Sequence, residues 1–63
     1  MNVLFNRISE FVDTFQKDYQ IGFEYKNEQL TLSLQSNGIK QLKVFYADEV
    51  INSQNNILLL NWG

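Results

Sequence analysis

The clearest pattern of hydrophobic and polar positions lies between residues 29 and 46. Leu30, Leu32 and Leu34 alternate with polar residues, which is the period-2 pattern of a strand with one buried face. Ser36-Asn37-Gly38 comes next, and these residue types favour a turn. A second apolar stretch then runs to Tyr46. The pattern therefore predicts a β-hairpin over residues 29–46.

The length of the turn decides which residues of this hairpin face each other. A two-residue loop at 37–38 places Leu32 opposite Lys43, which mixes apolar and polar residues on one face. A three-residue loop at 36–38 places Leu32 opposite Leu42 and leaves Gly38 at the position that requires a positive φ. We predict the three-residue loop, because a buried face enforces the register that groups apolar residues.

An amphipathic helix is predicted over residues 3–18. Its apolar positions recur at spacings of three and four, which is the helical period. They are Leu4, Ile8, Phe11 and Phe15. This helix stripe is the expected cover for one face of the sheet, because a small sheet in water must bury one face.

A first strand is predicted over residues 20–26, where the pattern changes from the helical period to alternation. A two-residue turn at 27–28 sets Tyr25 opposite Leu30 and Phe23 opposite Leu32. Both aromatic side chains then fall on the face that the helix covers. We expect them to pack in the core rather than to stack on nucleobases.

The chain after Tyr46 is predicted with alternatives. Residues 47–52 extend the third strand through a bulge, form a short separate strand, or make one helical turn begun at Asp48. Residues 53–56 are expected to be a loop, and 57–62 a last strand. The fold class is α+β: residues 1–63 form one small domain, with the N-terminal helix on one face of an antiparallel meander of four or five strands.

Two features of the predicted sheet indicate a binding surface. Parity directs Phe45 away from the helix, and the last strand carries large apolar residues on both faces. A terminal strand is also an edge that another chain can pair with. The predicted partner-binding residues are Phe45, Ile57, Leu58, Leu60 and Trp62. Residues 47–56 folding back over that face is the alternative.

The amino-acid composition excludes most kinds of catalytic site. The sequence has no cysteine and no histidine, so its serines have no imidazole base and no thiolate is present. The three glycines are isolated, which leaves no phosphate-binding loop. Asp48 and Glu49 would point to opposite faces of a strand. We predict a protein that is not an enzyme and holds no cofactor or metal.

Charge and hydropathy bear on the partner and the location. The net charge of -2 and the five dispersed basic residues argue against a partner held by phosphate contacts. The longest apolar run, Ile57–Leu60, is far too short to span a membrane. With no cysteine and no secretory signal pattern, we expect a soluble, cytoplasmic protein.

The function predicted from these observations is a small, non-enzymatic protein–protein interaction module. It would act as an inhibitor or modulator encoded by a mobile element, or as a self-assembling subunit, with a homodimer expected. The alternative is a single-stranded nucleic-acid-binding protein that uses Lys40, Lys43 and Phe45 on a sheet face.

Hydrogen exchange tests the predicted hairpin. The slowest amides of the chain should lie within residues 29–46, because core strands open only with the whole domain. Uniformly rapid exchange across this range would contradict the prediction.

Overall fold

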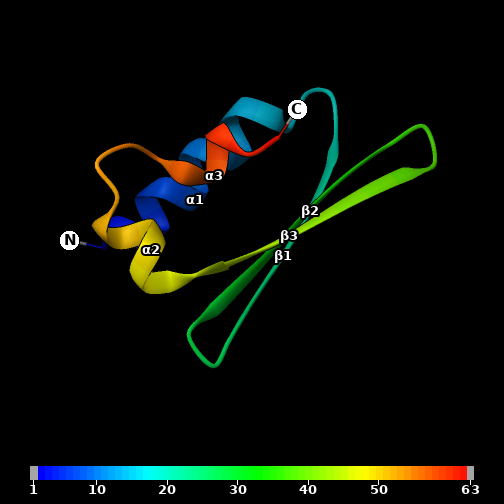
Figure 1. The fold of residues 1–63 in the computed structure, drawn as a ribbon. Helices are drawn as coiled ribbons and strands as arrows, with labels where there is room; N and C mark the ends of the chain where they lie inside the picture. The colour runs from blue at the N-terminus through cyan, green and yellow to red at the C-terminus, as the bar shows by residue number, and fades with distance from the viewer. Residues whose placement is uncertain (1, 63) are drawn as a thin grey trace.

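A computed structural model describes residues 2–62 and shows helices packed on one side of an antiparallel sheet (Figure 1). The elements are α1 (Val3–Phe15), β1 (Gln20–Lys26), β2 (Gln29–Ser36), β3 (Ile39–Tyr46), α2 (Ala47–Asn52) and α3 (Ile57–Leu60). The strand order is β1-β2-β3, which confirms the α+β class and the meander. The predicted number of strands is wrong, because residues 2–62 contain three strands and not four or five.

Helix α1 forms where the sequence predicts it. The Asn2 side chain accepts a hydrogen bond from the Phe5 amide at 3.1 Å, which satisfies one of the free amides of the first turn. The apolar stripe turns toward the sheet and buries Ile8 and Phe11. The last turn closes when the Gln16 amide donates to the Val12 carbonyl.

Both hairpins turn through two residues with positive φ. The first turn has Asn27 at 53° and Glu28 at 63°, and the second has Asn37 at 54° and Gly38 at 78°. Positive φ at both central residues is the type I′ turn, whose twist matches that of paired strands. The first register is confirmed, with Tyr25 opposite Leu30.

The predicted three-residue loop of the second hairpin is wrong. β3 pairs with β2 through the two-residue turn, so Leu32 lies opposite Lys43 and Leu30 lies opposite Phe45. Asn-Gly is the residue pair that type I′ turns favour most, and this turn preference prevails over the matching of apolar faces. As a result Phe45 faces the helices, while Leu42 and Val44 face away from them.

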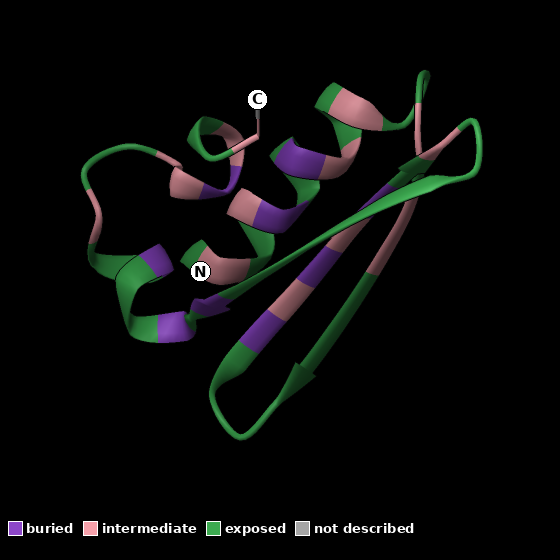
Figure 2. Cartoon of the chain, turned by 45° about the vertical axis from the view of Figure 1, so that its right-hand side comes forward, coloured by how far each residue is buried: buried purple, intermediate pink, exposed green. Residues whose placement is uncertain are grey.

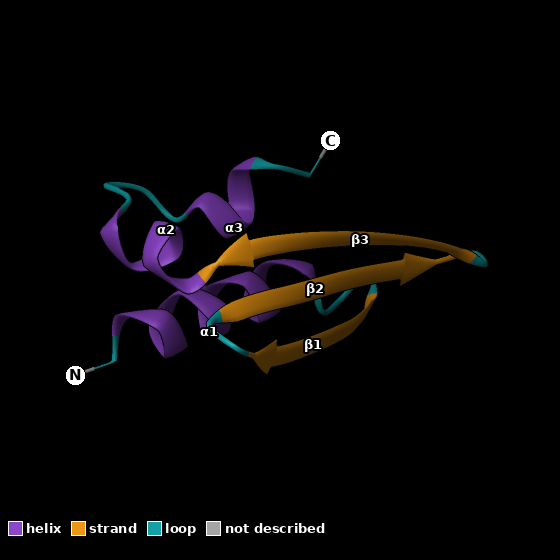
Figure 3. Cartoon of the chain, turned by 60° about the horizontal axis from the view of Figure 1, so that its bottom comes forward, coloured by secondary structure: helices purple, strands orange, loops and turns teal. Residues whose placement is uncertain are grey.

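The core is centred on the middle strand. Leu30, Leu32 and Leu34 of β2 are buried on the face toward the helices, and Figure 2 shows buried and half-buried positions alternating along this strand. The buried side chains of the other elements are Ile8, Phe11, Phe45, Ala47, Val50 and Leu58. Both edge strands lie outside this cluster except at Phe45, and the β2–β3 turn projects beyond the helices (Figure 3).

The C-terminal segment is helical and lies in the same layer as α1. The Ala47 amide donates to the Glu28 carbonyl at 2.9 Å, and α2 begins there, which selects the helical alternative for residues 47–52. The strand predicted over 57–62 is wrong. The Asn56 side chain caps the amide of Leu58 at 3.1 Å and donates to the Arg7 carbonyl at 3.0 Å, so it starts α3 and anchors it to α1. No helix within residues 2–62 is long and apolar enough to cross a membrane.

The turn geometry predicts a stabilising substitution. Glu28 holds a positive φ that costs a residue with a Cβ roughly 1–2 kcal/mol. Glu28→Gly should therefore stabilise the fold by about 1 kcal/mol, measured as a rise in the urea midpoint. Gly38→Ala is the matched control at the other turn and should lower the midpoint, although its Cβ meets no other atom within 4 Å. A lower midpoint for Glu28→Gly would contradict this account of the turns.

Candidate functional site

The five residues predicted to bind a partner do not form one surface. Phe45 is 7 % exposed and Leu58 is fully buried, so both belong to the core, while Leu60 is 67 % exposed. Ile57 and Trp62 are half-buried. In place of the edge strand expected over the last four of these residues, the structure has helix α3, which contains Ile57, Leu58 and Leu60 and ends before Trp62.

Packing explains why the two aromatic residues of this set turn inward. Phe45 lies opposite Leu30 in the observed register and so shares the face that the helices cover. The Trp62 ring lies 5.5 Å from the Phe11 ring, centroid to centroid, and its Nε1 donates to the Leu58 carbonyl. Trp62 therefore closes the helical layer instead of offering a free ring.

An apolar groove lies between the start of α1, the end of β1 and α2. We call it the β1 groove; it has a volume of about 360 Å³ and is lined by Asn2, Leu4, Phe5, Ile8, Phe23, Tyr25 and Ile51. Phe5, Phe23 and Tyr25 are 63 %, 58 % and 52 % exposed. Three aromatic side chains thus remain more than half exposed around one apolar hollow.

The prediction that Phe23 and Tyr25 pack in the core is correct about the sheet face on which they lie. It is wrong about their burial. Both lie opposite buried leucines of β2 and so point to the side of the helices. They remain exposed because β1 is an edge strand and the helices cover the middle strand. The sequence held no signal for this exposure, because a hydrophobic pattern gives the face of a side chain but not the width of the helical layer that covers it.

A second apolar row lies on β3, on the face without helices. We call it the β3 row; it consists of Leu42, Val44 and Tyr46, each more than half exposed. The two-residue turn places these side chains outside, because it reverses the parity that the three-residue loop would give. Large apolar side chains along one exposed strand mark a candidate interaction surface.

The backbone of each edge strand has free hydrogen-bonding groups at alternate residues. The bond from the Ala47 amide to the Glu28 carbonyl fixes the alternation along β3. Residues 42 and 44 direct their amides and carbonyls away from β2, toward the open edge. The same alternation applies to β2, whose residues bond in turn to β3 and to β1. It leaves the amides and carbonyls of residues 21, 23 and 25 of β1 directed away from β2.

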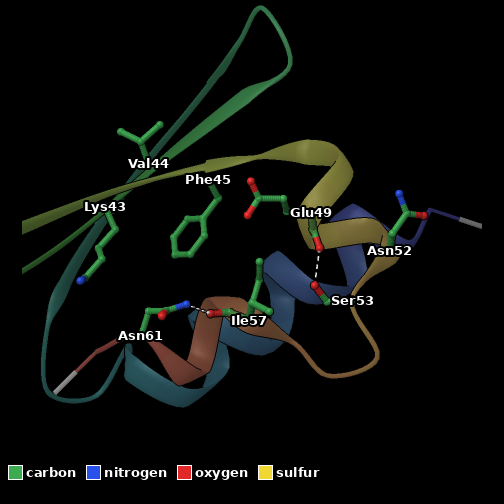
Figure 4. A pocket seen from close by; sticks show the side chains of 8 residues that line it. All are labelled: Lys43, Val44, Phe45, Glu49, Asn52, Ser53, Ile57 and Asn61. Atoms are coloured by element: carbon green, nitrogen blue, oxygen red, sulfur yellow. Dashed lines mark hydrogen bonds between the residues drawn. The ribbon is translucent and has the colours of Figure 1, made fainter.

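A cavity runs along β3 on the side of the helices. We call it the β3 cavity; it measures about 550 Å³ and is lined by Lys43, Val44, Phe45, Glu49, Asn52, Ser53, Ile57 and Asn61. Figure 4 shows Lys43 and Phe45 on the cavity side of the strand and Val44 on the other side. Asn61 donates to the Ile57 carbonyl at 2.8 Å, which fixes the far wall. The β3 cavity is open and has a mixed polar and apolar lining, with one cationic side chain from the strand.

The acidic residues do not form a group that could hold a metal ion within residues 2–62. Asp48 and Glu49 occupy the first turn of α2 rather than a strand, and both are exposed. Carboxylates at that position are favourable beside the positive end of a helix. Their place in the structure therefore has a structural cause.

Comparison with known protein families, with curated proteins and with solved structures finds no match to this chain.

Two phenylalanine substitutions distinguish the core from the groove. Phe45→Ala should destabilise the fold by about 3–5 kcal/mol, because it opens a cavity in the core. Phe23→Ala should change stability by less than about 1 kcal/mol, because more than half of this side chain is already in water. Urea denaturation at low micromolar protein concentration measures both. Equal losses of stability would contradict the observed register of β3.

Proposed function

We propose that this chain is a small, non-enzymatic protein–protein interaction module that binds a protein partner through the β1 groove. The observation that carries the proposal is the exposure of Phe5, Phe23 and Tyr25 around one apolar hollow. Aromatic residues are enriched in protein interfaces, where a few of them supply most of the binding energy.

The amount of exposed aromatic surface supports a macromolecular partner. A buried aromatic side chain covers 150–250 Å², so three that are more than half exposed present roughly 300 Å². That is comparable to the largest apolar patch of a typical monomer, which is often functional. A groove of about 360 Å³ admits the side chains of a partner segment, and the surrounding surface supplies the rest of an interface of ordinary size.

The non-enzymatic part of the proposal rests on the sequence. With no histidine and no cysteine, the usual general bases and nucleophiles near neutral pH are missing. The biological role takes one of two forms: an inhibitor or modulator of a larger macromolecule, of the kind that mobile elements encode, or a self-assembling subunit. A cytoplasmic location stays a prediction from the cysteine-free sequence.

The nucleic-acid alternative loses support from the positions of its three residues. Phe45 is buried in the core and has no free ring face for a base. Lys40 and Lys43 lie on opposite faces of β3, since their positions differ by an odd number along a strand. A steep fall of oligonucleotide affinity with salt concentration would restore this alternative.

Capture of partners from the native cell, read by mass spectrometry, tests the proposed surface. The bait is the whole chain, compared with Phe23→Ser and with Leu60→Ser. Leu60 is the matched control, because it is equally apolar and exposed but lies outside the β1 groove. Loss of a groove aromatic should weaken binding at least about tenfold, because interface aromatics often contribute 2 kcal/mol or more.

The two variants also separate the groove from the C-terminal surface. Partners lost with Phe23→Ser and retained with Leu60→Ser support the β1 groove. Partners lost only with Leu60→Ser would overturn the proposal and return the site to the C-terminal segment. Circular dichroism confirms beforehand that both variants remain folded.

A further inference from the structure

The two edge strands of the sheet are complementary to each other. β1 directs the backbone groups of Phe23 and Tyr25 outward, and both side chains line the β1 groove. β3 directs the backbone groups of Leu42 and Val44 outward, and both side chains lie on the face without helices. Each edge therefore combines free hydrogen-bonding groups with a row of exposed apolar side chains.

We infer that the partner that fills the β1 groove is a second copy of this chain, bound head to tail, with its β3 added antiparallel to β1. This inference rests on the proposed protein-binding function and names its partner. In the inferred register Phe23 lies opposite the partner's Val44, and Tyr25 lies opposite the partner's Leu42. Strand addition of this kind gains affinity from main-chain hydrogen bonds and specificity from alternate side chains.

Charge fixes this register. When Phe23 faces the partner's Val44, Glu24 faces the partner's Lys43, and opposite charges directly across two strands attract. A shift of two residues in one direction sets Lys26 against the partner's Lys43, which is a pair of like charges. The opposite shift brings the partner's Lys40 into the apolar groove beside Tyr25.

The side chains on both faces of the added strand would contact suitable surfaces. Residues that are directly opposite share a face, so the partner's Leu42 and Val44 come onto the groove side, next to Phe5. On the other side Glu24 enters the partner's β3 cavity, whose lining includes the lysine that it pairs with. One contact thus covers the β1 groove, the β3 row and both open edges.

Pairing between two identical edges would cover less of the exposed apolar surface. Two β3 strands related by a two-fold axis at residue 43 would set Lys43 against itself, and two β1 strands centred on residue 24 would set Glu24 against itself. Axes at Phe23 or Val44 avoid those repulsions, but each leaves the other edge and its apolar row exposed. The head-to-tail contact also leaves one edge free at each end, so it grows into a filament unless it closes into a ring.

Proline substitutions at the two edges test the inference. The amides of Phe23 and Val44 point outward, so proline at either position removes no hydrogen bond to β2 and blocks addition to that edge. In sedimentation at high micromolar concentration, the unmodified chain should form species larger than a dimer. Phe23→Pro alone and Val44→Pro alone should each be monomers.

Mixing the two variants gives the decisive measurement. Phe23→Pro retains a free β3 edge and Val44→Pro retains a free β1 edge, so an equimolar mixture should form a 1:1 dimer and nothing larger. A dimer of Val44→Pro alone would show β1–β1 pairing, and a dimer of Phe23→Pro alone would show β3–β3 pairing. Either result overturns the inference.

Charge reversal provides a second test if a proline variant does not fold. Glu24→Lys and Lys43→Glu each create like charges across the contact and should weaken assembly severalfold. Their mixture restores an attractive pair at every contact and should assemble as the unmodified chain does. An unmodified chain that stays monomeric at high micromolar concentration overturns the head-to-tail assembly, whereas partner capture that depends on Phe23 would leave the proposed function standing.

Discussion

The two-residue turn at Asn37–Gly38 is the constraint on which the rest of the structure depends. A turn of this length, with positive φ at both residues, fixes the parity of β3 against β2. Every side chain of β3 is thereby assigned to the helical side or to the open side. Phe45 enters the core and Leu42 stays outside for this reason alone. The position of α2 follows too, because β3 ends with Ala47 bonded to the first turn of the sheet.

The small size of the helical layer determines which strands are buried. Three leucines on β2 form a ridge that is fully or almost fully buried, and α1, α2 and α3 close over that ridge. A chain of 63 residues has few residues left to widen this helical layer, because small domains bury a smaller fraction of their surface. The edge strands therefore keep aromatic and aliphatic residues in water.

The elements that could be predicted from the sequence are those for which independent signals agree. Helix α1 has both a cap at Asn2 and an uninterrupted apolar stripe, and the first hairpin has a turn length that matches its apolar pattern. At the second hairpin the two signals conflict, because Asn-Gly favours a two-residue turn while the leucines of β2 and β3 favour three. The prediction based on the apolar match exchanges the two faces of β3. For this reason it wrongly places Phe45 on the predicted binding surface. The exposed aromatics of the groove could not be predicted, because the sequence pattern gives the face of a residue but not the width of the layer above it.

The C-terminal segment shows why a short apolar run is ambiguous between strand and helix. Ile57–Leu60 is apolar at every position, so it carries no periodicity that could distinguish the two. What decides is Asn56, which caps the helix and bonds to α1 through both Arg7 and Glu10. An asparagine before an apolar run is a cap signal, and the three leucines that follow in this run also favour a helix.

Charged side chains on the two edge strands explain how these open edges avoid unwanted pairing. Natural sheets protect edges with charged side chains, among other devices, and β3 carries Lys40 and Lys43 while β1 carries Glu24 and Lys26. In-register pairing of β3 with itself at residue 43, or of β1 with itself at residue 24, would oppose like charges. The one acidic residue of the two edges lies on β1, so the charge that repels a second β1 attracts a β3. Charges placed in this way discourage like pairing and leave unlike pairing open, which is how specificity against wrong partners is built into an edge.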